Sequence, residues 1–506
     1  MKELSYKDTI GCDNSDYLAI MFNVLLPLAY EFQPQLVLVS AGYDSAVGCP
    51  EGQMTVTPAC FAHFVNLLKT LAGGKIVLLL EGGYCVRTLA EASALSLRAL
   101  LGDPTPNISP ITGARKSVVE SVLNVIKMHR AVHPSLAFQD TQQEGKEVGH
   151  SWQTYLPPEH NIQCRTKYNR PEQFPLMQEC FDEVSDAVQQ QINQQIEQLE
   201  QDTILSRPAH RTGFLYYQDL HQNGKNGSVW DKANTKELLS RCHVVPITHD
   251  DNKNSMEACV SSAIDAILEN TVGSCILLPC GTYSEGTTQD LCYTFANALE
   301  ACIHKNSQIK RTLVLNLAVG EDEPLLTSFA GTKSCMVVLS VGLSPVEKRA
   351  KDPSWRHIIQ VPLTTSQMKN GDLISVGLQV LLPIAYEFAP DLVVFCLGSS
   401  EKKISQAEGQ TDLTCMAHLL TMLNGLARGR MLLFVKPSAE VQEFGVVMDC
   451  ISALLGDPLS ILQPCLPQQS TVEVIKTLQD KYKSSWRTLQ FREKLPSPRQ
   501  TLEESV

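Results

Sequence analysis

The apolar residues of the chain fall into short unbroken runs separated by longer amphipathic segments. In the first part of the chain the runs are Leu36–Ser40 and Ile76–Leu80. Apolar runs of this length that do not alternate with polar residues are typical of strands buried on both faces of a parallel sheet. The pattern therefore predicts an α/β fold of three layers, in which helices cover both faces of a parallel sheet.

The same pattern occurs twice. Residues 25–42 read LLPLAYEFQPQLVLVSAG and residues 381–398 read LLPIAYEFAPDLVVFCLG, so that 11 of 18 positions are identical. The motifs EGQ, AH and LLGDP recur further along at corresponding places. A spacing of about 355 residues is too long for a solenoid repeat, so we interpret it as the duplication of a domain.

Each copy is predicted to contain the same elements in the same order. The expected helices and strands are Tyr17–Phe32, Leu36–Ser40, Pro58–Leu71 and Ile76–Leu80, and in the second copy Val376–Phe388, Leu392–Cys396, Leu413–Leu426 and Met431–Val435. Additional α/β-like sequence precedes the second copy, whereas almost none precedes the first. We therefore expect a duplicated fold in which the first copy is incomplete and truncated at its N-terminus.

The expected domain organisation follows from these boundaries. Residues 1–139 form the first copy, 140–205 a Gln-, Glu- and Pro-rich linker, 206–495 the second copy, and 496–506 a disordered tail. In the linker, apolar residues recur at steps of four, four, four and three, namely Val184, Val188, Ile192, Ile196 and Leu199. This spacing predicts one helix. We expect the helix to lie on its own protein, with docking on a partner as the alternative.

Composition and charge exclude several classes. The 506 residues carry a net charge of −12 without a Lys/Arg block, which argues against a nucleic-acid partner. No signal peptide is evident, and no apolar run reaches the length of a membrane span. The 17 cysteines contain no C-x-x-C pair, so we expect buried thiols in a reducing compartment. These features predict a cytoplasmic protein, with a nuclear fraction as the alternative.

Candidate chemistry lies where the first copy's strands end, because ligands of parallel α/β sheets bind there. Asp44 follows one strand, and Gly82, Gly83 and Tyr84 follow the other. Asp44 could ligate a metal or act as a base, and Tyr84 could act as an electrophile. The alternatives are a helix cap for Asp44 and loop packing for Tyr84. Glu51, in a Pro/Gly loop, could select a cationic substrate or simply be solvated.

Two histidines need a different interpretation. His63 and His418 lie at equivalent places in the two copies, within predicted helices. Because the second copy lacks the candidate chemistry, we interpret both histidines as structural.

Together, the segments LVLVSAGYDSAVGCPEGQM and IVLLLEGGY resemble the second half of the catalytic domain of zinc-dependent histone deacetylases. The duplication is similar to class IIb, in particular to the polyamine deacetylase type. The resemblance implies that Asp44 is the last of three zinc ligands and that Tyr84 donates a hydrogen bond to the developing oxyanion. It implies that Glu51 is the gatekeeper carboxylate, and that Gly82 and Gly83 line the substrate site.

The departures from the family are equally informative. The family's histidine pair and first two zinc ligands precede the point at which the first copy begins, and catalytic zinc needs three protein ligands. In the second copy the corresponding positions hold residues that cannot replace them, with Ser400 or Glu401 at the third-ligand position: Thr282, Tyr283, Ala318, Gly320 and Ala439. We expect the second copy to be a pseudo-enzyme and this chain alone to be inactive and without bound Zn²⁺.

Three functions are therefore weighed. The first is an amidohydrolase that, in its complete form, removes acetyl groups from polyamines or from acetyl-lysine. The second is a non-catalytic scaffold or regulator whose protein partners bind the pseudo-domain. The third is a duplicated ligand-binding protein, which the losses at Ala439 and Ser400 argue against. The two predicted strands of the first copy carry no charged residue that would protect an exposed strand edge from aggregation. This favours an incomplete sequence, and therefore the first function.

Overall fold

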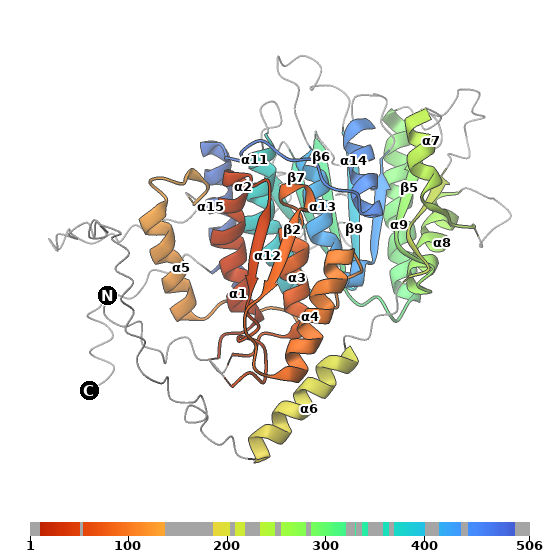
Figure 1. The fold of residues 1–506 in the computed structure, drawn as a ribbon. Helices are drawn as coiled ribbons and strands as arrows, with labels where there is room; N and C mark the ends of the chain where they lie inside the picture. Colours follow the sequence, from red (N-terminus) through yellow and green to blue (C-terminus); the bar gives the residue numbers. More distant parts are fainter. Residues whose placement is uncertain are drawn as a thin grey trace, which may run out of the picture.

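A computed structural model describes most of both copies. The described residues are 11–50, 54–136, 186–202, 208–217, 233–247, 255–279, 285–319, 329, 336–342, 358–363, 369–399, 414–436 and 444–490. Every sheet pairing in this part of the chain is parallel, and helices lie on both sides of the main sheet (Figure 1). The predicted α/β class is confirmed.

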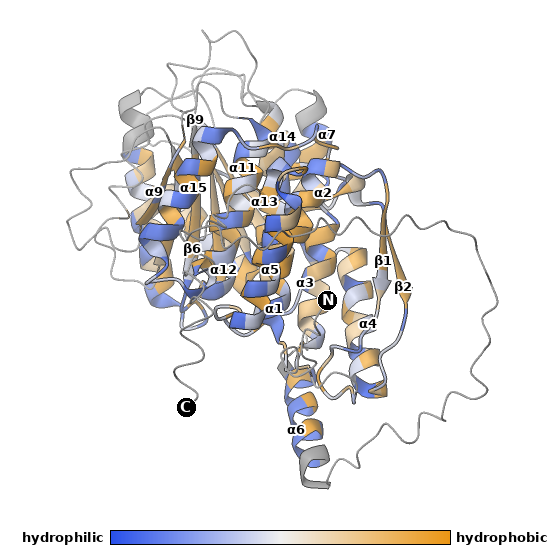
Figure 2. Ribbon diagram, turned by 90° about the vertical axis from the view of Figure 1, so that its left-hand side faces the viewer, coloured by the Kyte–Doolittle hydropathy of each residue, from blue (hydrophilic) through white to orange (hydrophobic). Residues whose placement is uncertain are grey.

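The first copy contributes a two-stranded sheet. Its elements are α1 (Asn14–Ile20), the π-helical turn η2 (Met21–Leu25), α2 (Leu26–Phe32), β1 (Val37–Ala41), α3 (Pro58–Leu68), η3 (Ala72–Gly74), β2 (Ile76–Leu80), α4 (Val86–Leu101), α5 (Lys116–His129) and η4 (Pro134–Leu136). Strands β1 and β2 pair with Val37 opposite Ile76. They lie at the margin of the molecule, with strongly apolar residues along them (Figure 2).

The second copy contributes an eight-stranded sheet in the order β4-β3-β5-β10-β9-β6-β7-β8. The linker helix α6 (Asp186–Asp202) precedes it. The elements are β3 (His210–Tyr217), α7 (Ala233–Ser240), β4 (His243–Val244), α8 (Met256–Leu268), β5 (Val272–Pro279), α9 (Glu285–Lys305), β6 (Thr312–Val319), β7 (Met336–Gly342), β8 (Ile358–Pro362), α11 (Asn370–Val376), η9 (Gly377–Leu381), α12 (Leu382–Phe388), β9 (Leu392–Ser399), α13 (Cys415–Asn424), η10 (Ala427–Gly429), β10 (Met431–Val435), α14 (Phe444–Leu455), α15 (Gln469–Tyr482) and η12 (Arg487–Leu489).

The duplication extends to irregular backbone. Both copies interrupt their first helix with a π-helical turn that leads into a Leu-Pro pair. Both end this helix on a left-handed residue, Gln33 or Ala389. The register is also repeated, because Met431 pairs with Val393 as Ile76 pairs with Val37. Such coincidences in unfavourable conformations indicate that the two copies share one backbone plan.

The copies pack together through reciprocal contacts. The Tyr30 hydroxyl of the first copy lies 3.0 Å from His418 Nδ1 of the second, and the Tyr386 hydroxyl of the second lies 3.0 Å from His63 Nδ1 of the first. All four side chains are buried. Tyr30 corresponds to Tyr386 and His63 to His418. Each copy therefore gives a tyrosine to the other copy's histidine, as in a pair related by approximate two-fold symmetry. The structural interpretation of both histidines is confirmed.

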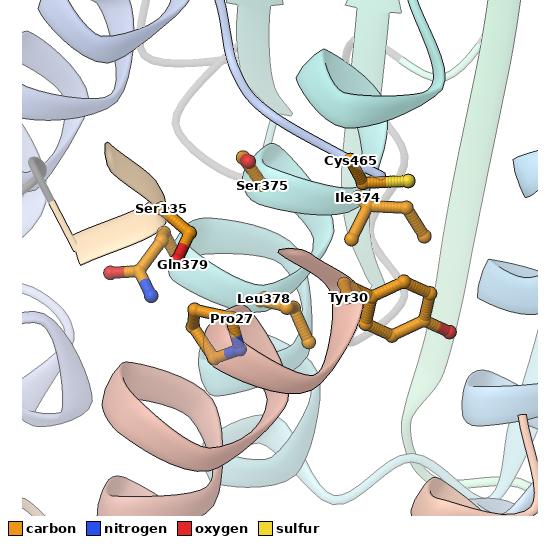
Figure 3. Close-up of a pocket in the computed structure, with 8 residues that line it drawn as sticks. All are labelled: Pro27, Tyr30, Ser135, Ile374, Ser375, Leu378, Gln379 and Cys465. Atoms are coloured by element: carbon orange, nitrogen blue, oxygen red, sulfur yellow. The ribbon is translucent and has the colours of Figure 1, made fainter. Parts of the chain in front are cut away.

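A small cavity lies at this interface (Figure 3). Residues of both copies line it, including Pro27 and Tyr30 from α2 and Leu378 and Gln379 from η9. The cavity volume is about 10 Å³, which is about what one water molecule needs. It belongs to the packing between the copies and is too small for a substrate.

The cysteines and one long apolar helical run test two expectations that were drawn from composition. The cysteines of the described residues are free thiols, and all but Cys85 are buried. The expectation that no apolar run is long enough for a membrane span is wrong for Asn370–Phe388, whose 19 residues reach a mean hydropathy of 1.2. This helical run is 89% buried within the fold, as a core helix is. Its apolar character is explained by packing.

Candidate functional site

The carboxyl ends of β1 and β2 bring two of the predicted motifs together. The backbone N–H of Gly83 donates to Asp44 Oδ1 at 3.0 Å. The strand pairing continues into these loops, because Glu81 N–H donates to Ala41 O at 3.0 Å and Tyr43 N–H to Gly82 O. The segments carrying Asp44 and Tyr84 are thus held in register by main-chain bonds.

Glycines make room for the Asp44 carboxylate. A Cβ atom at Gly82 would lie 2.5 Å from Asp44 Oδ2, and one at Gly42 would lie 2.9 Å from the same oxygen. Gly82 also has a φ of +99°, which an L side chain rarely adopts. Gly82 is therefore required by the close approach of the carboxylate, whereas Gly83 is required by the close approach of Tyr43, whose Cβ would lie 2.9 Å from an added Cβ atom.

We expect Gly82→Ala to displace Asp44 and to lower the free energy of unfolding by about 2 kcal/mol or more, because strain and collision act together. Amide exchange at Gly83 would report the lost hydrogen bond, and urea unfolding the stability. Gly445→Ala is the matched control, since a Cβ there meets nothing within 4 Å and the position is helical. Equal stabilities of the two variants would contradict the close approach.

Tyr84 and its neighbour Tyr43 have opposite surroundings. The Tyr84 side chain is 50% exposed, and its backbone N–H donates to Cys49 Sγ at 3.5 Å. Tyr43 is buried, donates its hydroxyl to Ser96 Oγ at 3.1 Å and packs against Phe61. Loop packing is therefore the role of Tyr43, whereas the Tyr84 ring has an open face that a ligand could reach.

Several predicted site residues lie outside the described residues. These are Glu51 of the first copy and Thr282, Tyr283, Gly320, Ser400, Glu401 and Ala439 of the second. Ala318 is placed near the end of β6, where it pairs with Gly398 of β9. Its position at a carboxyl strand end is where the family resemblance puts a ligand.

The residues around Asp44 do not make a zinc site by themselves. Within the described ranges, no group of three or more His, Cys, Asp and Glu residues is placed to hold a metal ion. Asp44 supplies one carboxylate, whereas catalytic zinc takes about three protein ligands. No chemical step through a metal is derived from this part of the chain.

Lys436 was missed by the sequence analysis. It follows β10 where Glu81 follows β2, and it is 6% exposed. Its side chain crosses the bare backbone of Gly398, and Nζ donates to Asn316 Oδ1 at 2.7 Å. Asn316 in turn donates to Ser340 Oγ. An ammonium group therefore occupies the strand ends of the second copy, where the first copy carries carboxylates.

Comparison with known proteins fits this geometry. The histone deacetylase domain matches residues 4–100, which contain β1, β2 and both motifs of the site. The human polyamine deacetylase HDAC10 is 28% identical over 95% of this chain, an alignment that runs through both copies. The chain is thus similar to histone deacetylases, at the domain level over residues 4–100 and to HDAC10 over most of its length.

Other relatives give the same assignment with different coverage. HDAC10 of Danio rerio is 27% identical over 94% of this chain, and HDAC10 of Rattus norvegicus is 48% identical over 23% of this chain and 18% of its own length. The chain spans 65% of the human relative and 64% of the zebrafish relative. The higher identity of the short alignment shows that similarity to this family is concentrated in part of the chain.

Proposed function

We propose that the first copy carries part of the active site of a class IIb deacetylase that hydrolyses acetylpolyamines, with acetyl-lysine as the alternative substrate. The observation that supports this most is the bond from Gly83 N–H to Asp44 Oδ1, which joins the SAGYD and EGGY motifs at the carboxyl strand ends. The half-exposed Tyr84 beside them supports it further.

The proposed roles follow from the chemistry of each side chain. Asp44 would supply one carboxylate oxygen to a zinc ion in a molecule that provides the remaining ligands, and the ion would serve there to polarise the acetyl carbonyl. Tyr84 donates its hydroxyl proton in a hydrogen bond to the oxygen that gains negative charge. Glu51 pairs with a charged amine of the substrate and disfavours neutral ones. Gly82 and Gly83 let the backbone approach the substrate closely.

The remaining ligands would come from neighbouring strands. In the second copy, β10 and β9 lie between β5 and β6, and the resemblance places the histidine pair and the Asp-x-His ligands after strands of this kind. We expect activity from a molecule in which β1 and β2 have such neighbours. The second copy, with Ala318 at one of these places and Lys436 at its strand ends, would not provide them.

For the second copy we propose a non-catalytic role as a structural partner of the first. The buried Tyr30–His418 and Tyr386–His63 contacts and the core shared by the two copies support this proposal. The second copy keeps an eight-stranded parallel sheet whose central strands are buried, and we infer that it does so without metal-binding side chains at its site positions.

We expect this chain, assayed with Zn²⁺ and either an acetylpolyamine or an acetyl-lysine peptide, to show no hydrolysis above a buffer control. Measuring the intact mass of the endogenous protein, captured through its Gln-rich linker, then identifies the molecule to test. In an active molecule, Tyr84→Phe and Asp44→Asn should each lower kcat/KM by about 100-fold or more. Glu51→Leu should lower it for acetylpolyamines only. Full activity of Tyr84→Phe would refute the assignment.

A further inference from the structure

The linker helix α6 has one apolar stripe that faces its own protein. Ile196 is 1% exposed, and Ile192 and Leu199 are partly buried, whereas most of the other described side chains of the helix are exposed. The expectation that this helix lies on its own protein is confirmed. In Figure 1 the helix lies beside the lower end of α4, at the first copy.

The stripe contacts the loop that follows Asp44. A Cβ atom at Gly48 would lie 3.0 Å from Ile192 Cγ2, 3.1 Å from Ile196 Cδ1 and 3.2 Å from Cys85 Sγ. The isoleucines therefore pack on the bare backbone of Gly48, next to Cys85. Gly48 belongs to the segment that carries Asp44, and Cys85 directly follows Tyr84. The isoleucines of α6 thus pack on the segment that carries Asp44, at a glycine that also lies beside Cys85 of the segment that carries Tyr84.

Charged contacts fix the same helix to the turn after Tyr84. Arg87 Nε and Nη2 donate to the two carboxylate oxygens of Glu200, each at 2.5 Å, and Arg87 Nη1 lies 3.6 Å from Glu197. Arg87 is the second residue of α4. A bidentate pair of this geometry fixes direction as well as distance. The apolar and the charged contacts together hold α6 at two points.

We propose that helix α6 is part of the rim of the first-copy site, with Ile196 and the Arg87–Glu200 pair acting as positioning residues for the segments of Asp44 and Tyr84. The proposal deepens the proposed function, since it concerns the same site. It makes the linker a determinant of site geometry, so that any change that lifts α6 loosens the Gly83–Asp44 contact.

Hydrogen exchange of the full chain tests the proposal without requiring turnover. Arg87→Glu should place a carboxylate against Glu197 and Glu200 and speed exchange in residues 43–50 and 82–88, including Gly83, on the order of five-fold or more. The reversed pair, Arg87→Glu with Glu200→Arg, should restore protection. Rescue by the reversed pair separates a positioning contact from a general loss of folding.

A matched control is available in the second copy. Arg241 makes a bidentate pair with Asp457 at 2.8 and 2.6 Å, and Arg241→Glu should leave exchange at Gly83 unchanged. Ile196→Ala should loosen the same two segments as Arg87→Glu. Faster exchange confined to α6, with Gly83 unaffected in both variants, would overturn the proposal. Exchange coupling in this chain, combined with full activity of Tyr84→Phe in an active molecule, would support the rim and refute only the proposed function.

Discussion

Acidification from pH 6.5 to pH 4 is expected to remove on the order of 3 kcal/mol of folding stability for each of the two histidines between the copies. Burial lowers the pKa of both His63 and His418 from 6.5 to about 4. Between these pH values the unfolded chain binds two protons that the folded chain does not. The stability contribution is therefore complete above pH 6.5 and is lost as the pH falls towards 4.

The hydrogen bonds explain why the neutral histidines suit this place. His63 Nε2 donates to Pro106 O at 2.8 Å, and His418 Nε2 donates to Ser460 O at 2.9 Å. His63 Nδ1 is then a lone-pair acceptor for the hydroxyl of Tyr386 in the other copy, at 3.0 Å. Protonation of Nδ1 would turn this acceptor into a donor and place a charge in the core.

Urea unfolding at a series of pH values checks the prediction. In the double variant His63→Gln and His418→Gln, we expect lower stability at pH 8 and a weaker decline of stability between pH 6.5 and 4. The variant Tyr386→Phe should lose about 1–3 kcal/mol, because it leaves the buried acceptor His63 Nδ1 without its donor. An unchanged pH dependence in the double glutamine variant would show that other groups dominate the acid response.

Sequence patterns predicted the regular elements better than the contacts between them. Strands β2 and β10 coincide with the predicted runs Ile76–Leu80 and Met431–Val435. Strand β3, which adds to the sheet beside β5, was missed because its apolar residues are interrupted by Arg211, Thr212 and Gly213. Thr212 is nevertheless buried, and its hydroxyl donates to Leu454 O. Burial of a satisfied polar residue leaves no signal in an apolar pattern.

The candidate site was partly predictable for a physical reason. Both strands of the first copy are parallel neighbours, so residues after their carboxyl ends must meet, and Asp44 does meet Gly83. The contact of Ile196 with Gly48 depends on how α6 docks, which helical spacing alone does not specify. Lys436 was not predicted because its contacts join three elements that are far apart in the sequence. Its side chain follows β10, packs on Gly398 of β9 and binds Asn316 of β6. Local sequence encodes strand ends, whereas contacts across elements require the fold.

Equivalent substitutions in the two copies are expected to have very different effects. Leu38 of β1 corresponds to Val394 of β9, yet Leu38 is 64% exposed and Val394 is 0% exposed. Val394 lies in the core formed with α8 and α9, where Phe434 stacks on Phe295 with ring centroids 3.9 Å apart. The corresponding face of β1 and β2 carries Leu38, Val77 and Leu79, all exposed.

Val394→Lys should therefore lower the free energy of unfolding by roughly 4 kcal/mol or more, since it buries an unpaired charge. Leu38→Lys should change it by less than about 0.5 kcal/mol and should reduce aggregation, because a lysine disfavours contacts at an exposed apolar strand. Urea unfolding and light scattering of this chain measure both. A large loss of stability in Leu38→Lys would mean that this face is covered in the folded molecule. In an active deacetylase whose β1 and β2 have further strands beside them, the same lysine should become as damaging as the one at Val394, so the size of its effect reports whether the first-copy sheet is complete.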